Sequence, residues 1–338
     1  KNRGGRAGAG VETLPTFRPI ADRGQVSSVS APSKPSSPPA RPPALRPGSR
    51  VAVVSPSGPA DWRAFWSGIA WLGARYEVVV AAATLESLKF PGFAVRAEHP
   101  GYLAGGDGAR LASLEEAFGD RRIEAVFAAR GGYGAPRIVE EFERRCGGAS
   151  KWLVGFSDVT SLHRARVAGG HMCLHAANVT GLGAAHAADR RALLAALEGE
   201  AFHPLATPRT LNPGDASGVV VGGNLALVHA EAAAGRWRAP EGAIVVLEDV
   251  GERPYRIDRL LTTLGPALAS AAAVVFGDFT EAMPGPDGVT VEDVLEDFAR
   301  RNQALPMVAG ARFGHGARNA PIPLGAVGAL ADGWLRFS

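Results

Sequence analysis

The sequence predicts an α/β protein with a parallel sheet in its N-terminal part and a smaller, β-richer second domain. Between residues 50 and 167, short apolar runs alternate with helix-like segments, which is the pattern of right-handed βαβ units. After about residue 217 the apolar runs are separated mainly by Gly and Pro turns, which is typical of short strands. The 338 residues are enough for two domains, at roughly 100–200 residues each.

The elements of the first part are predicted in chain order from their apolar periodicity. Strands are expected at 51–54, 77–82, 123–128 and 152–154, and helices at 61–72, 105–118, 137–145 and 161–167. Asp61 is expected to cap the first helix. Loops that follow parallel strands meet at one edge of a sheet, where ligands bind. The Gly-rich loops 130–134 and 155–158 both follow predicted strands, and they therefore mark the functional edge.

The remaining chain divides into a tail, a linker and a second domain. Residues 1–48 hold nine of the 25 prolines and little apolar periodicity, so we expect a disordered tail. We place the first domain at 49–200, a Pro-containing linker at 201–216 and the second domain at 217–338. Strands of the second domain are expected at 219–224, 244–247, 274–276 and 335–337.

Charge and composition exclude several classes of function. Residues 1–48 carry a net charge of +6 and the whole chain +3, so the predicted domains are mildly acidic, which disfavours nucleic acid as a partner. No run approaches the ~18 apolar residues of a membrane span, so no membrane insertion is expected. Two cysteines without Cys-x-x-Cys spacing predict buried thiols rather than a disulfide framework, which fits a reducing compartment or a fold that tolerates free thiols.

Residues 155–160, Gly-Phe-Ser-Asp-Val-Thr, link an apolar strand to a helix. Such a sharp turn presents a serine hydroxyl beside free helix N–H groups, as nucleophile turns do. The same residues could instead cap the helix, with Ser157 or Asp158 accepting from its first amides. The turn alone does not decide between these interpretations.

The loop at 130–134, Arg-Gly-Gly-Tyr-Gly, lacks the spacing of a dinucleotide site and the Lys-Ser/Thr ending of a phosphate loop. Its glycines allow close approach of a substrate, and a backbone N–H there could stabilise an oxyanion. The alternative is a tight turn with an exposed tyrosine.

Two further residues could complete a catalytic site. His315 stands between two glycines, an open setting in which core packing explains a histidine poorly. Glu248 ends a strongly apolar run and must find a partner, either a histidine or one of Arg253, Arg256 and Arg259. A metal at His171, Cys173 and His175 is disfavoured, because further ligands at suitable spacing are missing.

These residues lie in segments over which the chain resembles the LD-carboxypeptidases of the S66 serine peptidase family, at about residues 49–328. The segments that carry the resemblance occur in one order: RVAVVSPSGP at 50–59, YLAGGDGARLASLEEAF at 102–118, ARGGYGAPRI at 129–138, VGFSDVTSLH at 154–163, GGNLALV at 222–228, VLEDVGERPYRIDRLLTTL at 246–264, GDFT at 277–280 and FGHGARNAPIPLGA at 313–326. Together they are far more specific than any single motif.

The resemblance implies roles for individual residues. It implies a Rossmann-like N-terminal domain, a barrel-like C-terminal domain and a catalytic triad of Ser157, Glu248 and His315, with Glu248 preferred over Glu252. The backbone N–H groups of Gly132 and Asp158 would form the oxyanion hole. Tyr133 and Asn224 are expected to contact the substrate.

The same resemblance implies a cytoplasmic, homodimeric serine carboxypeptidase that releases the terminal D-alanine of murein tetrapeptides and needs no metal or organic cofactor. The alternatives are a microcin-immunity-type hydrolase of peptidyl-nucleotide toxins and a non-catalytic peptide-binding homologue. One departure concerns the strand after the nucleophile helix. Many relatives have His-Gly-Pro there, whereas this chain has His175, Ala176 and Ala177, which puts the neighbouring substrate wall in doubt.

Overall fold

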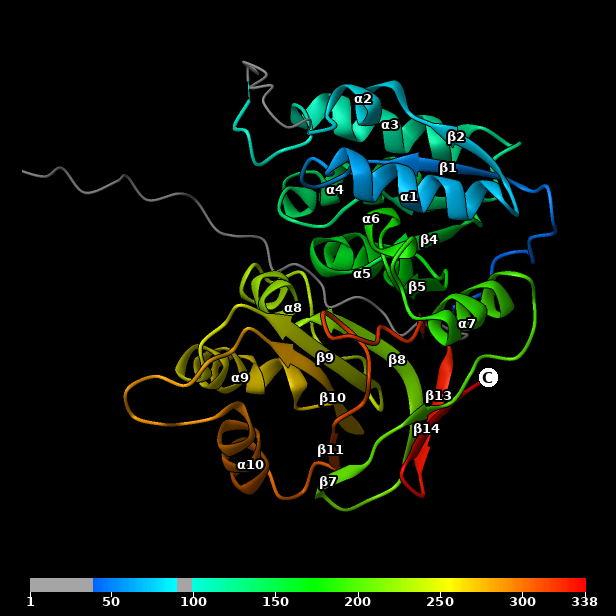
Figure 1. Cartoon of the computed structure of the whole chain (residues 1–338). Coiled ribbons are helices and arrows are strands. Elements are labelled where there is room, and N and C mark those ends of the chain that lie inside the picture. Colours follow the sequence, from blue (N-terminus) through cyan, green and yellow to red (C-terminus); the bar gives the residue numbers. More distant parts are fainter. Residues whose placement is uncertain (1–38, 90–98) are drawn as a thin grey trace, which may run out of the picture. The chain divides into compact units, whose positions relative to one another are not determined.

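A computed structural model describes residues 39–89 and 99–338. The described residues belong to one compact unit that is built around two sheets (Figure 1). Most of the predicted tail, residues 1–38, lies outside the described residues. The α/β fold class is confirmed, and each sheet carries part of the candidate site.

The first sheet has the strand order β12-β5-β4-β3-β1-β2. Its strands are β1 (Arg50–Val54), β2 (Glu77–Val80), β3 (Ala125–Ala128), β4 (Trp152–Gly155), β5 (Cys173–His175) and β12 (Ile322–Leu324). β1 to β5 are parallel, and only β12 is antiparallel to its neighbour. Because helices cover both faces, β3 and β4 are buried at every residue, which explains their continuous apolar sequences.

Helices on the two faces of this sheet form separate core clusters. Leu114 of α3 (Asp107–Gly119), Phe142 of α4 (Val139–Cys146) and Leu162 of α5 (Thr160–Ala168) pack in one cluster. Phe65 of α1 (Trp62–Gly73) and Leu193 of α7 (Ala187–Leu197) pack in the other. The short elements are α2 (Ala82–Glu86), η1 (Ala135–Arg137), η2 (Ser157–Val159) and α6 (Val179–Leu182). The predicted cap is confirmed, since the Asp61 side chain accepts from Ala64 N.

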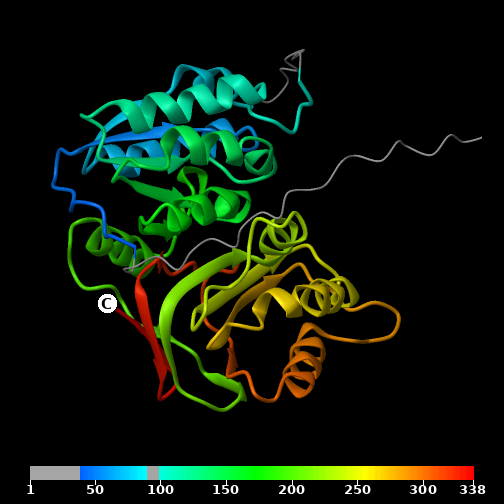
Figure 2. The same cartoon turned by 180° about the vertical axis from the view of Figure 1, so that it is seen from behind.

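The second sheet has the order β6-β14-β13-β8-β9-β10-β11-β7. Its strands are β6 (Leu205–Ala206), β7 (Arg209–Asn212), β8 (Ala216–Asn224), β9 (Ile244–Val250), β10 (Ala273–Thr280), β11 (Met307–Ala309), β13 (Val327–Ala331) and β14 (Trp334–Phe337). The central strands β8 to β11 are parallel, and the outer strands are antiparallel to their neighbours. Figure 2 shows the long, yellow-green β8 curving so that the sheet curls.

Three helices connect the strands of the second sheet and pack against it: α8 (Leu225–Ala233), α9 (Pro254–Leu268) and α10 (Val291–Arg301). This region is therefore richer in helix than its sequence predicted. Among the described residues, no helix combines the length and apolar character that crossing a bilayer requires.

Three segments differ from the sequence-based organisation. Residues 39–48 are not disordered, because Leu45 is buried and its N–H donates to Leu197 O. The predicted linker 201–216 contains β6 and β7, which belong to the second sheet. Within the predicted second domain, β12 pairs with β5 of the first sheet. The chain therefore returns to the first sheet directly after the segment that carries His315.

Candidate active site

The turn between β4 and α5 holds Ser157 in a strained conformation. Phe156 is extended, whereas Ser157 has a φ of 65°, a left-handed value that costs a residue with a side chain about 1–3 kcal/mol. Neither η2 nor α5 has a side-chain cap, so the capping interpretation of Ser157 and Asp158 is wrong. Strain of this kind is typical of functional turns.

The Gly-rich loop after β3 packs directly on this serine. A Cβ atom added at Gly131 would lie 3.0 Å from Ser157 Cβ and 3.1 Å from its Oγ, so any side chain here would crowd the serine. Gly132 has a φ of +104°. The buried Asp158 carboxylate accepts from Ala135 N at 2.7 Å, and burial raises the pKa of Asp158. Asp158 therefore joins the serine turn to the end of the Gly-rich loop.

The buried side chain of Arg110 supports the same loop from α3. Its guanidinium donates to Pro56 O in the loop after β1 and to Asp107. A Cβ at Gly134 would lie only 2.7 Å from Arg110 Nη1. The loops that follow β1 and β3 are thus held against one guanidinium group.

Strand β9 of the second sheet supplies a carboxylate, and the loop between β11 and β12 supplies an imidazole in contact with it. Glu248 lies on β9 and is fully buried, and its Oε2 is 2.6 Å from His315 Nδ1. Gly314 has a φ of +106°, and a Cβ there would lie 2.6 Å from Glu248 Oε2. The His315 ring packs on Phe156, the residue before Ser157, with a centroid distance of 4.6 Å.

The arginine alternative for Glu248 is wrong. Within the described residues, the ion-pair partners of Glu248 are His315 and His175, while Arg256 lies 3.6 Å from Glu252. Burial raises the pKa of Glu248, but the two histidines outweigh it and hold the pKa below its ordinary value. The carboxylate is therefore ionised at neutral pH.

His175 is a residue of the site that sequence reasoning missed. Its Nε2 lies 3.6 Å from Glu248 Oε1, whereas His315 contacts the other carboxylate oxygen, Oε2. The ring is fully buried between Phe156 and Phe313. Burial and the neighbouring His175 lower the pKa of His163. The His163 imidazole is therefore uncharged. The position of His175 at the end of β5, on the functional edge, was the available signal.

The loop that carries His315 is anchored at its far end by α7. The buried Asp189 carboxylate accepts from Arg318 at 2.6–3.1 Å and from Asn319 N at 3.1 Å. The Asn319 side chain then accepts from Gly314 N at 3.0 Å. The residues on both sides of His315 are thereby fixed to each other and to the first sheet.

Two family models match the chain. The LD-carboxypeptidase N-terminal domain matches residues 51–176, and the LD-carboxypeptidase C-terminal domain matches residues 217–330. The chain belongs to the LD-carboxypeptidase family. The resemblance found in the sequence is therefore confirmed.

Named relatives agree with this LD-carboxypeptidase assignment. A probable murein peptide carboxypeptidase of Bacillus subtilis is 32% identical, over 86% of this chain and 91% of the relative. A murein tetrapeptide carboxypeptidase of Pseudomonas aeruginosa is 30% identical, over 70% of this chain and 81% of the relative.

Solved structures share the LD-carboxypeptidase fold. The muramoyltetrapeptide carboxypeptidase of Oxalobacter formigenes superposes with a TM-score of 0.73 at 24% identity, covering 85% of this chain and 97% of that one. The self-immunity protein MccF, in complex with glutamyl sulfamoyl guanosine, gives 0.71 at 17% identity, with coverages of 89% and 99%. At these identities the likeness shows the fold alone.

The two predicted substrate contacts of this LD-carboxypeptidase lie in different settings. Tyr133 is exposed and packs beside Tyr102 at a centroid distance of 5.8 Å. Asn224 is buried, its Oδ1 caps α8 and its Nδ2 donates to Asp249 at 2.8 Å. Both ends of the Asn224 amide are thus occupied by partners within the protein. Its direct contact with substrate stays a prediction, as does that of Tyr133.

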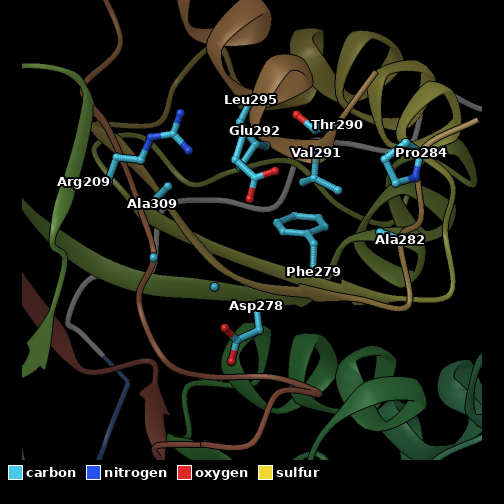
Figure 3. Close-up of a pocket in the computed structure, with 12 residues that line it drawn as sticks. Arg209, Asp278, Phe279, Ala282, Pro284, Thr290, Val291, Glu292, Leu295 and Ala309 are labelled. Atoms are coloured by element: carbon cyan, nitrogen blue, oxygen red, sulfur yellow. The ribbon is translucent and has the colours of Figure 1, made fainter. Parts of the chain in front are cut away.

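A pocket of about 370 Å³ lies on the second sheet beside the His315 loop. In Figure 3 the Asp278 carboxylate points away from Thr290, Glu292 and Leu295, which line the opposite wall. A Cβ at Gly316 would lie 2.1 Å from Asp278 Oδ2, so Asp278 lies against the His315 loop. The pocket therefore borders this loop, and Ser157 is not among its lining residues.

Proposed function

We propose that the protein is a serine LD-carboxypeptidase that releases the terminal D-alanine of murein tetrapeptides at an L–D bond. Ser157 is the nucleophile, His315 the general base and Glu248 the carboxylate that orients the imidazole. The named relatives support the substrate class. The proposal also includes a cytoplasmic location and a homodimer. Each chain would contribute a nucleophile domain built on the first sheet and a second domain built on the second sheet.

The observation that carries the proposal is the Glu248–His315 pair beside the strained serine turn. A buried, ionised carboxylate 2.6 Å from Nδ1 holds the tautomer whose Nε2 can accept a proton. The packing of His315 on Phe156 keeps the imidazole next to the turn that presents the hydroxyl.

The reaction follows from these roles. His315 Nε2 takes the proton of Ser157 Oγ as the oxygen attacks the carbonyl carbon of the L–D bond. The negative charge that develops on the carbonyl oxygen is stabilised by the N–H groups of Gly132 and Asp158. His315 then donates the proton to the departing amine of D-alanine. Water, activated by the same imidazole, hydrolyses the acyl-enzyme and restores Ser157.

Two features support the proposed oxyanion hole. The N–H of Asp158 directly follows the nucleophile, and the N–H of Gly132 lies in the loop that contacts Ser157. Among the residues that the structure describes, neither of these N–H groups donates to a backbone carbonyl or a side chain, so both remain available for a substrate oxygen.

The test is incubation of the purified chain with the L-Ala-γ-D-Glu-diaminopimelate-D-Ala peptide and measurement of free D-alanine. We expect release by the parent protein and none above background by Ser157→Ala. Ser161→Ala is the matched control, because Ser161 is a buried hydroxyl on the adjoining helix, and it should retain activity. Release by Ser157→Ala at the parent rate would refute the mechanism.

The same assay separates the alternatives. Cleavage of an aminoacyl-sulfamoyl adenylate without release of D-alanine would assign the protein to the immunity-type hydrolases. Binding of the tetrapeptide without cleavage of either compound would indicate a non-catalytic peptide-binding homologue.

A further inference from the structure

Arg130 stands out among the arginines around the serine turn because it has no acidic partner. Arg137 and Arg110 pair with Asp107, and Arg318 pairs with Asp189. Arg130 is exposed, and within the described part of the chain no carboxylate lies within ion-pair distance of it. Its charge is therefore available to a ligand.

The guanidinium of Arg130 is nevertheless held in place. Nη1 donates to Pro59 O at 3.2 Å, and a Cβ at Gly58 would lie 3.0 Å from the same nitrogen. The loops after β1 and β3 are themselves joined, since Gly58 N donates to Gly131 O at 2.9 Å. One nitrogen thus fixes the group, while Nε and Nη2 have no partner among the described residues.

This position lies next to the proposed reaction centre. A Cβ at Gly132 would lie 3.4 Å from Arg130 Nη1, and one at Gly131 would lie 3.1 Å from Ser157 Oγ. The cation therefore borders the proposed oxyanion donor. A carbonyl bound at Gly132 would have the end of the peptide close to this guanidinium.

A substrate with a free C-terminus brings a negative charge, its α-carboxylate, into the site, and a nearby cation would stabilise that charge. The α-carboxylate of a terminal residue lies only a few bonds from the scissile carbonyl. The described site already holds the Glu248 carboxylate, which would repel that anion. A planar guanidinium binds a carboxylate with two parallel hydrogen bonds, and this geometry also selects against a neutral amide.

We propose that Arg130 binds the free α-carboxylate of the residue that is released and so restricts the enzyme to the end of the peptide. The inference rests on the proposed carboxypeptidase function and adds the residue that makes the activity exopeptidic. Arg130 touches the substrate but takes no part in proton transfer.

The test compares two substrates, the tetrapeptide acid and its C-terminal D-alanine amide, with the full-length chain. The parent should prefer the acid strongly. Arg130→Gln should lose about 100-fold in kcat/KM on the acid, the upper range for lost hydrogen bonds to a charged group. Its kcat/KM on the amide should change less than about threefold, so that the preference collapses. Arg130→Lys should retain part of the preference, because it keeps the charge without the fork.

The amide and a surface variant serve as controls. Arg121→Gln removes an exposed arginine remote from Ser157, at the turn before β3, and should leave both rates unchanged. An equal loss by Arg130→Gln on acid and amide would show a structural role and overturn the proposal, as would an unchanged preference for the acid. If the parent cleaves neither compound, the proposed function fails and the carboxylate site falls with it. If the parent cleaves the acid, the proposed function stands, and the rates of Arg130→Gln on acid and amide alone decide whether Arg130 binds the carboxylate.

Discussion

Ser157 and His315 reach the same site from two sheets that position them by different means. On the first sheet, backbone geometry positions the serine: a φ of 65° at Ser157 and close contact with Gly131 leave the turn little freedom. Burial and charge position the imidazole instead, through Glu248 of the second sheet and through the Asp189 anchor on α7. The position of the serine should therefore depend on volume alone, whereas the position of the imidazole should also depend on charge.

The largest effect is expected from Glu248→Gln. A neutral amide cannot hold the correct tautomer or stabilise the imidazolium, so kcat should fall about 10⁴-fold with KM little changed. The readout is steady-state release of D-alanine. Glu252→Gln is the control, because this carboxylate is partly exposed beside Arg256, and it should stay near the parent rate. A large loss in Glu252→Gln with activity intact in Glu248→Gln would reverse the assignment.

Gly131→Ala tests the sensitivity of the serine turn to volume. The added methyl would meet Ser157 Cβ at 3.0 Å and push the serine by a few tenths of an ångström. Because a misplacement of about 1 Å costs about 100-fold in rate, we expect kcat to fall by about 10-fold. Gly148→Ala adds the same methyl where no atom lies within 4 Å and should leave kcat unchanged. Equal rates in the two variants would contradict the geometric account of the serine.

His175→Phe tests whether Glu248 needs its second histidine. Phenylalanine keeps the packing on Phe156 and Phe313 but removes the nitrogen that faces Glu248. The His175–Glu248 contact is 3.6 Å long and therefore electrostatic rather than a hydrogen bond. We expect its loss to lower kcat by about 10-fold or less.

The pH profile distinguishes this role from simple packing. Although burial raises the pKa of Glu248, His175 and His315 hold it below its ordinary value, so protonation of this carboxylate reduces activity only as the pH falls through that lowered pKa. Without His175 the pKa rises, and the acid limb of kcat moves to higher pH. His175→Gln keeps a donor and should restore the parent profile. An unshifted acid limb in His175→Phe would show that His175 only packs.

Asp189→Asn should give the smallest effect. The amide would weaken the contacts to Arg318 and Asn319, at a net cost of about 0.5–1.5 kcal/mol, or about 3- to 10-fold in kcat/KM. The thermal unfolding midpoint should fall as well. Asp297→Asn, which removes an exposed partner of Arg300 and Arg301, should change neither quantity, as is usual for surface pairs. If the two variants behaved identically, Asp189 would not be needed to anchor the loop that carries His315.

The elements that could be predicted from sequence are those with local signals. The Asp61 cap, the buried strands β3 and β4 and the Ser157 turn each depend on a few neighbouring residues. Helix α9 was missed because Gly265 and Pro266 interrupt its apolar pattern, although packing of Leu261, Leu264 and Leu268 keeps it helical. Tertiary burial outweighed the local preference there.

The parts of the site that could not be predicted depend on contacts between distant segments. His175 meets Glu248 across 73 positions of chain, and nothing beside either residue in sequence marks the other. Aspartate is a residue type that often caps helices, yet the Asp158 carboxylate accepts a hydrogen bond from Ala135 N in another loop. Such partners follow from strand order, which a single sequence does not contain.

Strand β12 ties the two halves of the molecule together in a way that limits how the chain can be divided. A fragment ending at residue 216 would keep β1 to β5 but lose β12, the antiparallel neighbour of β5. The unpaired N–H and C=O groups of β5 would then form an open edge that can recruit another chain. The buried Cys173–His175 strand would become a site of aggregation. The part of the chain that carries Ser157 therefore depends for its solubility on a strand that lies more than a hundred residues later in the sequence.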